Sequence, residues 1–270
     1  MKLQYISDVH LEKFKVFPKF KVTGDNLALL GDIGYPKTKI YKDFIEYCSN
    51  NWENVFLLYG NHEFYNYPTP KDKRDIQTVS SIKGFNKSNL MCYPNVYILD
   101  NDTIFIHKTL NTVTYRKPDP QFQCNYIKII GSTLWSRIEL KTSTLVNDYK
   151  YIYTDMNKLI TPKETLNFFI ESVEYIKSKL DTTKCDAILL THHAIHDICN
   201  GKYQGNKMCS AFATTIPELF EKNNLKYAIN GHTHESLSNK IKDVYLLSNC
   251  FGYNIQEREK FNECTILELE

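Results

Sequence analysis

The chain has 270 residues, of which 42% are hydrophobic and 24% charged, a composition typical of soluble globular proteins that can bury a core. Its 33 lysines and arginines nearly balance its 31 aspartates and glutamates, and the formal net charge of +2 disfavours a general polyanion-binding protein. No run approaches the roughly 18 apolar residues of a membrane span, and Asp8 comes too early for a signal-peptide core. We therefore expect a soluble, cytoplasmic protein with no membrane partner.

The eight cysteines are spread along the chain without a Cys-x-x-Cys pair, at a density too low for a disulfide scaffold. This usage is typical of reduced thiols in a reducing compartment. The chain also has no Gly/Ser-rich linker, no long run of like charge and no repeat at a fixed period. We expect a single domain that spans residues 1–270.

Short apolar runs rich in isoleucine, valine, leucine and tyrosine recur along the chain and predict strands, several of them buried on both faces. In chain order they are Leu3 to Ile6, Leu27 to Leu30, Val55 to Tyr59, Val96 to Leu99, Ile104 to Ile106, Ile127 to Ile130, Ala187 to Leu190, Tyr227 to Ile229, Val244 to Leu247 and Thr265 to Leu269.

Helical patterns separate some of these strands. The string Thr161-Pro162-Lys163-Glu164 can begin a helix, because threonine caps, proline fits the first turn and glutamate completes a capping box. Helical spacing also covers Thr38 to Cys48 and Ile216 to Asn223, and the polar, proline-containing stretch from Tyr65 to Tyr93 predicts a loop followed by a helix. The alternation of strands and helices indicates a layered α/β or mixed α+β fold.

Side chains that commonly bind metals follow the predicted strands, where α/β folds build their sites. Ser7-Asp8-Val9-His10 follows the first strand, and its carboxylate and imidazole project to the same side of an extended segment. Gly31-Asp32-Ile33-Gly34-Tyr35 follows the second, where Gly31 permits a tight turn and Asp32 offers two oxygens that could bridge two cations. Each string alone is also compatible with an ordinary polar loop.

Three further clusters extend the pattern. Tyr59-Gly60-Asn61-His62-Glu63 joins an amide oxygen to an adjacent imidazole after the third strand. Thr191-His192-His193-Ala194 and Asn230-Gly231-His232-Thr233-His234-Glu235 follow two later strands. Because aspartate, asparagine and histidine are depleted in buried strand-end turns unless something pairs them, five such clusters in one order are difficult to attribute to chance.

Together the five clusters resemble the motif series of the calcineurin-like metallophosphoesterase superfamily, D-x-H, G-D-x-x-D/Y, G-N-H-E/D, H and G-H-x-H, which runs here from Asp8 to His234. Further strings, among them Gly131-Ser132-Thr133-Leu134-Trp135, are similar to a cytosolic subgroup common in bacteria. The resemblance implies an α/β (α+β layered) sandwich of two mixed β-sheets flanked by helices. It also implies hydrolysis of a small-molecule or nucleotide phosphate ester by a metal-activated hydroxide, as in a phosphatase or phosphodiesterase.

The same resemblance carries metal ligands onto this sequence. It implies a first ion held by Asp8, His10, Asp32 and His234, and a second ion held by Asp32, Asn61, His192 and His232. Asp32 would bridge the two ions, and His62 would stabilise or protonate the leaving oxygen, so that Asp32 and His62 are the expected catalytic residues. The mixed oxygen and nitrogen ligands suit manganese, iron or zinc, with manganese expected first and magnesium as a further candidate.

Some assignments stay open from the sequence. His193 could take the place of His192 through a slip of one residue, and otherwise would orient a neighbouring ligand. Tyr35 could line the cleft or, as in purple acid phosphatases, bind ferric iron, although those enzymes lack a histidine at the position of His10. Structural or supporting roles are expected for His107, Arg137, Asp148, Asn230, Glu235 and Cys250, and a cleft or loop position for His196. As an alternative, Arg137 or Arg116 could bind a substrate phosphate through two hydrogen bonds.

Two other functions also stay open. A nuclease or nucleic-acid repair phosphodiesterase shares the five motifs, but such enzymes generally add a capping or DNA-binding segment, and this chain has no basic stripe. A non-catalytic, protein-binding member of the fold would have lost ligands, whereas every expected ligand type is present here. Substrate choice would depend on the cleft walls, which we expect from Tyr65 to Lys87, Leu110 to Asn125 and His196 to Ser210.

Overall fold

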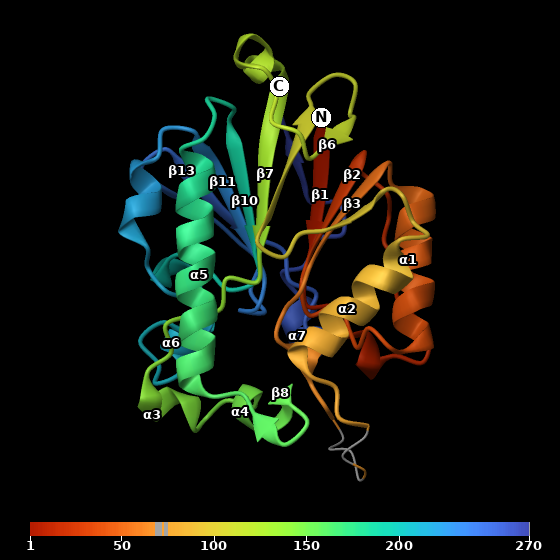
Figure 1. Ribbon diagram of the computed structural model, residues 1–270, viewed down its shortest axis with the longest axis vertical. Coiled ribbons are helices and arrows are strands. Elements are labelled where there is room, and N and C mark those ends of the chain that lie inside the picture. The colour runs from red at the N-terminus through yellow and green to blue at the C-terminus, as the bar shows by residue number, and fades with distance from the viewer. Residues whose placement is uncertain (68–71, 73–74, 270) are drawn as a thin grey trace.

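Two β-sheets packed face to face form the centre of the protein (Figure 1). The computed structural model describes residues 1–67, 72 and 75–269. The first sheet contains, in spatial order, β14 (Ile266–Glu268), β1 (Lys2–Ile6), β2 (Asn26–Leu30), β3 (Asn54–Leu58) and β4 (Val96–Ile98). The second contains β12 (Leu237–Ile241), β13 (Val244–Ser248), β11 (Leu225–Asn230), β10 (Ala187–Thr191), β7 (Tyr126–Ser132), β5 (Asp102–His107) and β6 (Val113–Thr114). A separate hairpin pairs β8 (Tyr153–Asp155) with β9 (Lys158–Leu159).

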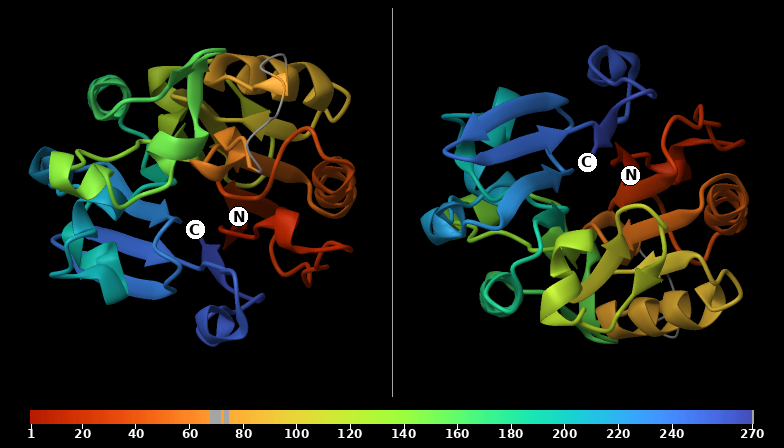
Figure 2. Two further views of the ribbon diagram at one scale, coloured as in Figure 1. Left: turned by 90° about the horizontal axis from the view of Figure 1, so that it is seen from below. Right: turned by 90° about the horizontal axis from the view of Figure 1, so that it is seen from above.

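Helices cover the outer faces of the sandwich. Figure 1 shows α1 and α2 beside the first sheet and α5 beside the second, and Figure 2 shows the two sheets side by side from both ends. The α-helices are α1 (Lys39–Asn51), α2 (Val79–Leu90), α3 (Leu140–Ser143), α4 (Asp148–Tyr151), α5 (Pro162–Leu180), α6 (Cys209–Phe212) and α7 (Ile255–Arg258). The 3-10 helices are η1 (Leu11–Lys13), η2 (His62–Phe64), η4 (Pro120–Asn125), η5 (Asp197–Tyr203) and η6 (Pro217–Glu221). Among the described residues, no helix combines the length and the apolar character needed to cross a bilayer.

Apolar side chains form three layers, one between the sheets and one on the outer face of each sheet. In β2, Ala28 and Leu30 belong to the layer between the sheets, whereas Leu27 and Leu29 pack with side chains of α1 in an outer layer. Every residue of β2 is therefore buried, as expected for a parallel strand covered on both faces. The central layer contains side chains of both sheets, which supports the proposal of one domain across residues 1–270.

The direction of the strands determines where their loops meet. In the first sheet β1, β2, β3 and β4 run parallel, and in the second β7, β10, β11 and β13 do. The two termini lie at one end of the sandwich, where β1 pairs with β14 (Figure 1). The loops that follow β1, β2, β3, β10 and β11 gather at the other end, because a parallel strand leaves its sheet at its carboxyl end.

Most predicted elements are confirmed. Each predicted strand is present, with ends that differ by at most two residues. Thr161 caps α5, because its hydroxyl accepts a hydrogen bond from the Glu164 N–H at 3.3 Å while the Glu164 carboxylate accepts one from the Thr161 N–H at 3.0 Å. Helix α1 begins after Thr38, and α2 confirms the helix expected after the polar loop. Residues 68–71, 73 and 74 of that predicted loop lie outside the described residues.

Several elements differ from the prediction, which also lacked the short strands β6, β8 and β9. The expected helix from Ile216 to Asn223 is instead the short 3-10 helix η6, which ends at Glu221 and is followed by three non-helical residues before β11 begins at Leu225. Strand β12 was not predicted, since this edge strand is partly exposed and its sequence, LSNKI, contains no continuous apolar run.

Candidate metal centre

Five loops bring polar side chains together at the carboxyl ends of the parallel strands. In chain order these are Asp8 and His10 after β1, Asp32 after β2, Asn61 and His62 after β3, His192 after β10, and His232 and His234 after β11. All except His62 are more than nine-tenths buried. Buried carboxylates and imidazoles at such density require partners of opposite charge or a bound ion.

The backbone at these positions is strained. Asp8, His10, Asp32, His232 and His234 have φ angles between 52° and 69°, in the left-handed region that non-glycine residues rarely adopt. Such conformations cost about 1–3 kcal/mol each and cluster at functional sites, where the surrounding structure holds them. The strain therefore marks this end of the sandwich as the functional end.

One group of potential ligands combines Asp8, His10 and His234, whose ligating atoms all lie within 4.8 Å of one another. The Nε2 atoms of His10 and His234 are 3.2 Å apart, and His234 Nε2 is 3.4 Å from an Asp8 carboxylate oxygen. The backbone N–H of His232 donates to both oxygens of Asp8, which holds this carboxylate in place.

A second group combines Asp32, His192 and His232 within the same 4.8 Å limit. The His192 Nε2 atom lies 3.4 Å from Asp32 Oδ1 and 3.1 Å from the amide oxygen of Asn61. The other Asp32 oxygen is 3.9 Å from His10 Nε2 in the first group. Asp32 therefore lies between the two groups and faces both.

Three of the imidazoles are oriented by an oxygen acceptor on the far side of the ring. The Nδ1 atom of His10 lies 3.1 Å from Glu12, that of His192 lies 2.8 Å from the Leu30 carbonyl, and that of His234 lies 2.8 Å from Glu257. Each Nδ1 therefore carries a hydrogen, and each Nε2 faces the centre of the site. This is the orientation that a metal-binding histidine requires.

The electrostatics of the site attract positive charge. Burial lowers the pKa of His192, but the Asp32 carboxylate outweighs this effect and raises the pKa to about 9. In the same way, Asp8 and Glu257 raise the pKa of the buried His234 to about 10. Despite burial, His234 lowers the pKa of Asp8 to about 2. The protons on these imidazoles occupy the side that faces the carboxylates, where a metal ion would replace them. The donors therefore fit one or more divalent cations.

Two glycine turns allow Asp32 and His192 to approach each other. A Cβ atom on Gly60 would lie 2.1 Å from Asp32 Oδ1 and 2.7 Å from the His192 ring, and Gly31 has a positive φ of 84°. The buried Glu63 carboxylate accepts hydrogen bonds from the N–H groups of Gly60 at 2.6 Å and of Asp32 at 3.0 Å. It ties together the turns that follow β2 and β3.

His62 forms a third group of possible ligands with His10 and Asp32, within the same 4.8 Å limit, and it also lines the cavity. The backbone N–H of His62 donates a hydrogen bond to the Asp32 carboxylate at 2.8 Å. The Nε2 atom of its ring is 3.0 Å from the Tyr253 hydroxyl, and the ring stacks on Tyr65 with centroids 4.1 Å apart. Although burial lowers it, the Asp32 and Glu12 carboxylates hold the pKa of His62 above its ordinary value. His62 can therefore carry a proton at the mouth of the site.

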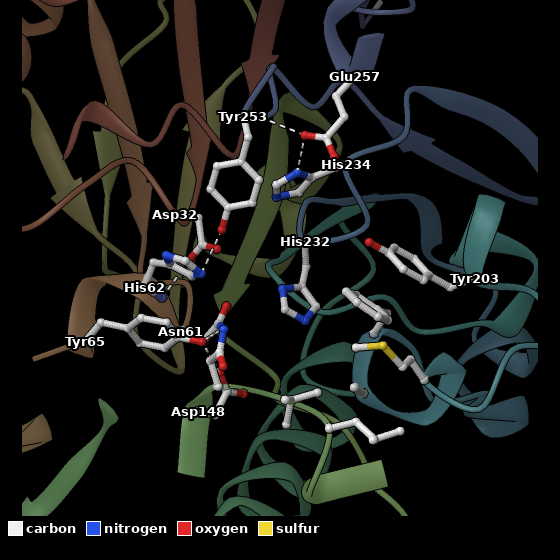
Figure 3. A pocket seen from close by; sticks show the side chains of 16 residues that line it. Asp32, Asn61, His62, Tyr65, Asp148, Tyr203, His232, His234, Tyr253 and Glu257 are labelled. Carbon is white, nitrogen blue, oxygen red and sulfur yellow. Dashed lines mark hydrogen bonds and ion pairs between the residues drawn. The ribbon is translucent and has the colours of Figure 1, made fainter. Parts of the chain in front are cut away.

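A cavity of about 280 Å³ opens over these residues (Figure 3). Asp32, Asn61, His62, His232 and His234 line it, together with residues that the sequence did not single out as ligands. Of those, Tyr253 and Glu257 come from the C-terminal segment, and Asp148 accepts a hydrogen bond from the Asn61 amide at 2.7 Å. Tyr253 also stacks on His10 with ring centroids 4.0 Å apart.

Of the two adjacent histidines, His192 and not His193 faces Asp32. The His193 Nδ1 lies 3.2 Å from the Thr133 carbonyl, and the ring stacks on Trp135. Burial, together with the neighbouring His192, lowers the pKa of His193 to about 3. His193 therefore supports the site as a neutral side chain packed beneath it.

The expected cleft walls require a correction. The segment from Leu110 to Asn125, with Arg116, does not line the cavity, because β5 runs antiparallel to β7 and its following loop emerges at the opposite end of the sandwich. Arg137 is also absent from the cavity and lies over the Phe169 ring. Residues 145–148 line the cavity instead, together with Tyr65, Tyr203 and Met208 from the two other expected segments.

The remaining candidates lie outside the cavity. The Tyr35 side chain does not line it, and burial raises the pKa of its phenol, which disfavours a phenolate. His107 bonds to its own turn, His196 packs against Phe220, and Cys250 accepts a hydrogen bond from Ser7. Asn230 donates to the Gly231 carbonyl and Glu235 pairs with Lys260.

Comparisons with known proteins identify the family and the fold. A family model described as calcineurin-like phosphoesterase matches residues 1–236. The uncharacterised protein L509 of Acanthamoeba polyphaga mimivirus is 30% identical over 99% of this chain and 96% of its own length. The crystal structure of phosphopantetheinyl hydrolase from Mycobacterium tuberculosis is similar with a TM-score of 0.64 at 14% identity, over 95% of this chain and 90% of that one. At this identity the likeness shows the fold, two mixed sheets flanked by helices.

Proposed function

The chain belongs to the calcineurin-like phosphoesterase family and is a phosphoester-hydrolysing enzyme, and from this premise we propose that it uses two divalent metal ions to hydrolyse a small-molecule or nucleotide phosphate ester. The observation that carries the proposal is the pair of ligand groups that share the space on either side of Asp32. Each group offers carboxylate oxygen and imidazole nitrogen, which suits divalent transition metals.

The two groups support one ion each. In this proposal the first ion is held by Asp8, His10, Asp32 and His234, and the second by Asp32, Asn61, His192 and His232. Asp32 would contribute to both sites, because its two oxygens face different groups. The mixed ligand set favours manganese, with iron, zinc and magnesium as the alternatives to be compared.

Bound divalent ions supply Lewis acidity, which polarises a phosphoryl group and lowers the pKa of water at the site. The protein orients the ligands for this task. Glu12, the Leu30 carbonyl and Glu257 fix three imidazole rings, and such outer partners commonly change metal affinity or activity by about 10–100-fold when removed. Asp148 fixes the Asn61 amide in the same way, so that its oxygen faces His192.

His62 is the proposed proton donor. Its ring is held between Tyr65 and the Tyr253 hydroxyl, and its Nε2 reaches the cavity. In the reaction, water adds to phosphorus, the bond from phosphorus to the leaving oxygen breaks, and that oxygen receives the proton from His62. The products are an alcohol and a phosphate with one ester group fewer.

The test is a substrate panel on purified protein. Chromogenic monoesters and diesters, nucleotides and single-stranded DNA are incubated with the chelated protein and with protein reloaded with manganese, zinc, iron or magnesium. We expect hydrolysis of at least one small-molecule ester that disappears on chelation and returns with manganese. Full hydrolysis by the chelated protein, or cleavage of the DNA alone, would contradict the proposal.

A further inference from the structure

Apolar side chains flank the cavity on the side of His232. They form what we call the apolar wall, which consists of Leu145, Val146, Tyr203, Met208, Ala211 and Phe212. The Phe212 ring lies 4.8 Å from the His232 ring, and Tyr203 stacks on Phe212 with centroids 4.0 Å apart and planes 10° apart. A continuous surface of rings therefore leads away from the candidate metal centre.

Hydrogen bonds between two distant chain segments build this wall. The Thr142 hydroxyl, before Leu145, donates to the Lys207 carbonyl at 2.8 Å, and the Ser136 hydroxyl donates to the Ala211 carbonyl at 3.1 Å. The wall is nevertheless open, because Leu145 is half exposed and Phe212 is only partly buried. Apolar side chains that face a polar cavity, rather than the core, are typical of ligand sites.

The apolar wall and His62 lie on different sides of the cavity. Figure 3 shows His62 on one side of His232 and Tyr203 on the other. If His62 protonates the leaving oxygen, the leaving group lies on the His62 side. A group that packs on the apolar wall is therefore an ester group that stays on phosphorus, and the substrate carries two ester groups.

The charges of the cavity agree with a substrate of low charge. Among the described residues that line it, Asp32, Asp148 and Glu257 carry carboxylates, and none is lysine or arginine. Asp148 has one oxygen engaged by Asn61 and by the Tyr65 hydroxyl. The proposed ions would attract the phosphate oxygens of either kind of ester, but beyond them and the imidazoles the lining adds only negative charge. A phosphodiester, with one negative charge, meets less repulsion from these carboxylates than a phosphomonoester, which carries up to two.

We propose, on the basis of the function proposed above, that the substrates are phosphodiesters whose retained ester group is aromatic or otherwise apolar and packs on Phe212. Hydrolysis forms a bond between water oxygen and phosphorus and breaks the bond to the leaving oxygen. The products are an alcohol and a phosphomonoester that still carries the apolar group.

The first experiment compares three esters that share one leaving group. Phenyl 4-nitrophenyl phosphate, methyl 4-nitrophenyl phosphate and 4-nitrophenyl phosphate all release nitrophenolate, and differ in having a retained phenyl, a retained methyl or no retained ester. With manganese-loaded protein we expect kcat/KM for the phenyl diester to exceed that for the methyl diester by about tenfold, equivalent to about 1.4 kcal/mol of ring contact. The monoester should be the slowest of the three.

Because the two diesters differ in intrinsic reactivity, the decisive quantity is the change of their ratio on substitution. Phe212→Ala should reduce the phenyl-to-methyl ratio severalfold, and Phe212→Leu, which keeps apolar volume, should reduce it less. Phe122→Ala is the matched control, since Phe122 is an exposed ring outside the cavity and its loss should leave the ratio unchanged. A ratio measured on one sample does not depend on the folded fraction of that sample.

Binding provides a second readout that requires no turnover. Methyl(phenyl)phosphinate and dimethylphosphinate are monoanions without an ester bond and differ only in the ring, while phenylphosphonate keeps the ring and adds charge. Calorimetry with manganese-loaded protein should give methyl(phenyl)phosphinate the highest affinity, and Phe212→Ala should remove its advantage over dimethylphosphinate.

The outcomes separate the two proposals. Metal-dependent hydrolysis with a phenyl-to-methyl ratio that Phe212→Ala leaves unchanged would overturn this inference and leave the proposed function standing. A kcat/KM for the monoester above that for both diesters would also overturn this inference. No hydrolysis of any ester by the metal-loaded protein would overturn the proposed function, and this inference with it.

Discussion

Substitution of one glycine by alanine should disable the site without adding a polar group or removing a ligand. A Cβ atom on Gly60 would lie 2.1 Å from Asp32 Oδ1, 2.6 Å from the Asp32 nitrogen and 2.7 Å from the His192 ring. Real Cβ atoms essentially never come within 3.0 Å of such atoms. Asp32 and His192 are both almost fully buried, so neither can move aside without leaving its position.

The size of the effect follows from the displacement. Asp32 Oδ1 must retreat by about 1 Å merely to reach the 3.0 Å limit, and a misplacement of about 1 Å in a catalytic arrangement can cost about 10²-fold in rate. We expect Gly60→Ala to lower kcat/KM at least that much and to weaken metal binding, measured by metal content after dialysis against a competing chelator.

Two glycines provide matched controls. Gly84 in α2 has no atom within 4 Å of an added Cβ, so Gly84→Ala should raise the free energy of unfolding by about 0.5–1 kcal/mol and leave metal content unchanged. On Gly131 a Cβ would lie 2.3 Å from the Leu99 side chain in the core, so Gly131→Ala should destabilise the fold while its folded fraction keeps the metal. A folded Gly60→Ala protein with unchanged metal affinity and rate would refute the argument that this turn sets the distance between Asp32 and His192.

Three further predictions concern separate groups. His62→Ala should retain the metal and lose about 10²–10⁴-fold in rate for an alkoxide leaving group but much less for nitrophenolate, and loss of the metal from this variant would make His62 a ligand instead. Tyr35→Phe should change neither metal content nor visible absorbance, because the first proposed ion has four other ligands and a phenol with a raised pKa gives no charge-transfer band. This prediction would be wrong if the iron-loaded, oxidised protein were purple and lost its colour in the Tyr35→Phe variant. Apparent metal affinity should rise with pH across the range from 6 to 9, because the pKa of His192 is raised to about 9 and that of His234 to about 10, and the ions must displace both protons. A pH-independent affinity in calorimetric titrations between pH 6 and pH 9 would be inconsistent with these two histidines as ligands.

The strands and the main ligand candidates could be predicted because short, contiguous stretches of the sequence indicate them. Buried parallel strands read as continuous apolar runs, and Asp8, Asp32, Asn61 and His192 each follow such a run within a few residues. A residue that directly follows a predicted parallel strand is placed by the topology of the sheet. The assignment of these distant residues to two metal sites, by contrast, came from the resemblance to the metallophosphoesterase motifs.

Partners that come from outside these strings could not be predicted. Tyr253 and Glu257 reach the site from the C-terminal segment, and no local spacing links them to His10 or His234. Among these partners, only Glu12 lies close in sequence to the ligand that it orients, two residues after His10. The cleft walls were misjudged at Leu110 to Asn125 because this assignment depends on the antiparallel direction of β5, which an apolar run does not reveal.

The central claim is that two metal ions share Asp32, and anomalous diffraction from crystals of the manganese-loaded protein tests it most directly. We predict two anomalous peaks about 3.5–4 Å apart, one on each side of Asp32, as in two-metal hydrolytic sites. One peak should contact Asp8, His10 and His234, and the other Asn61, His192 and His232. A single peak, or peaks that contact neither group, would contradict the account.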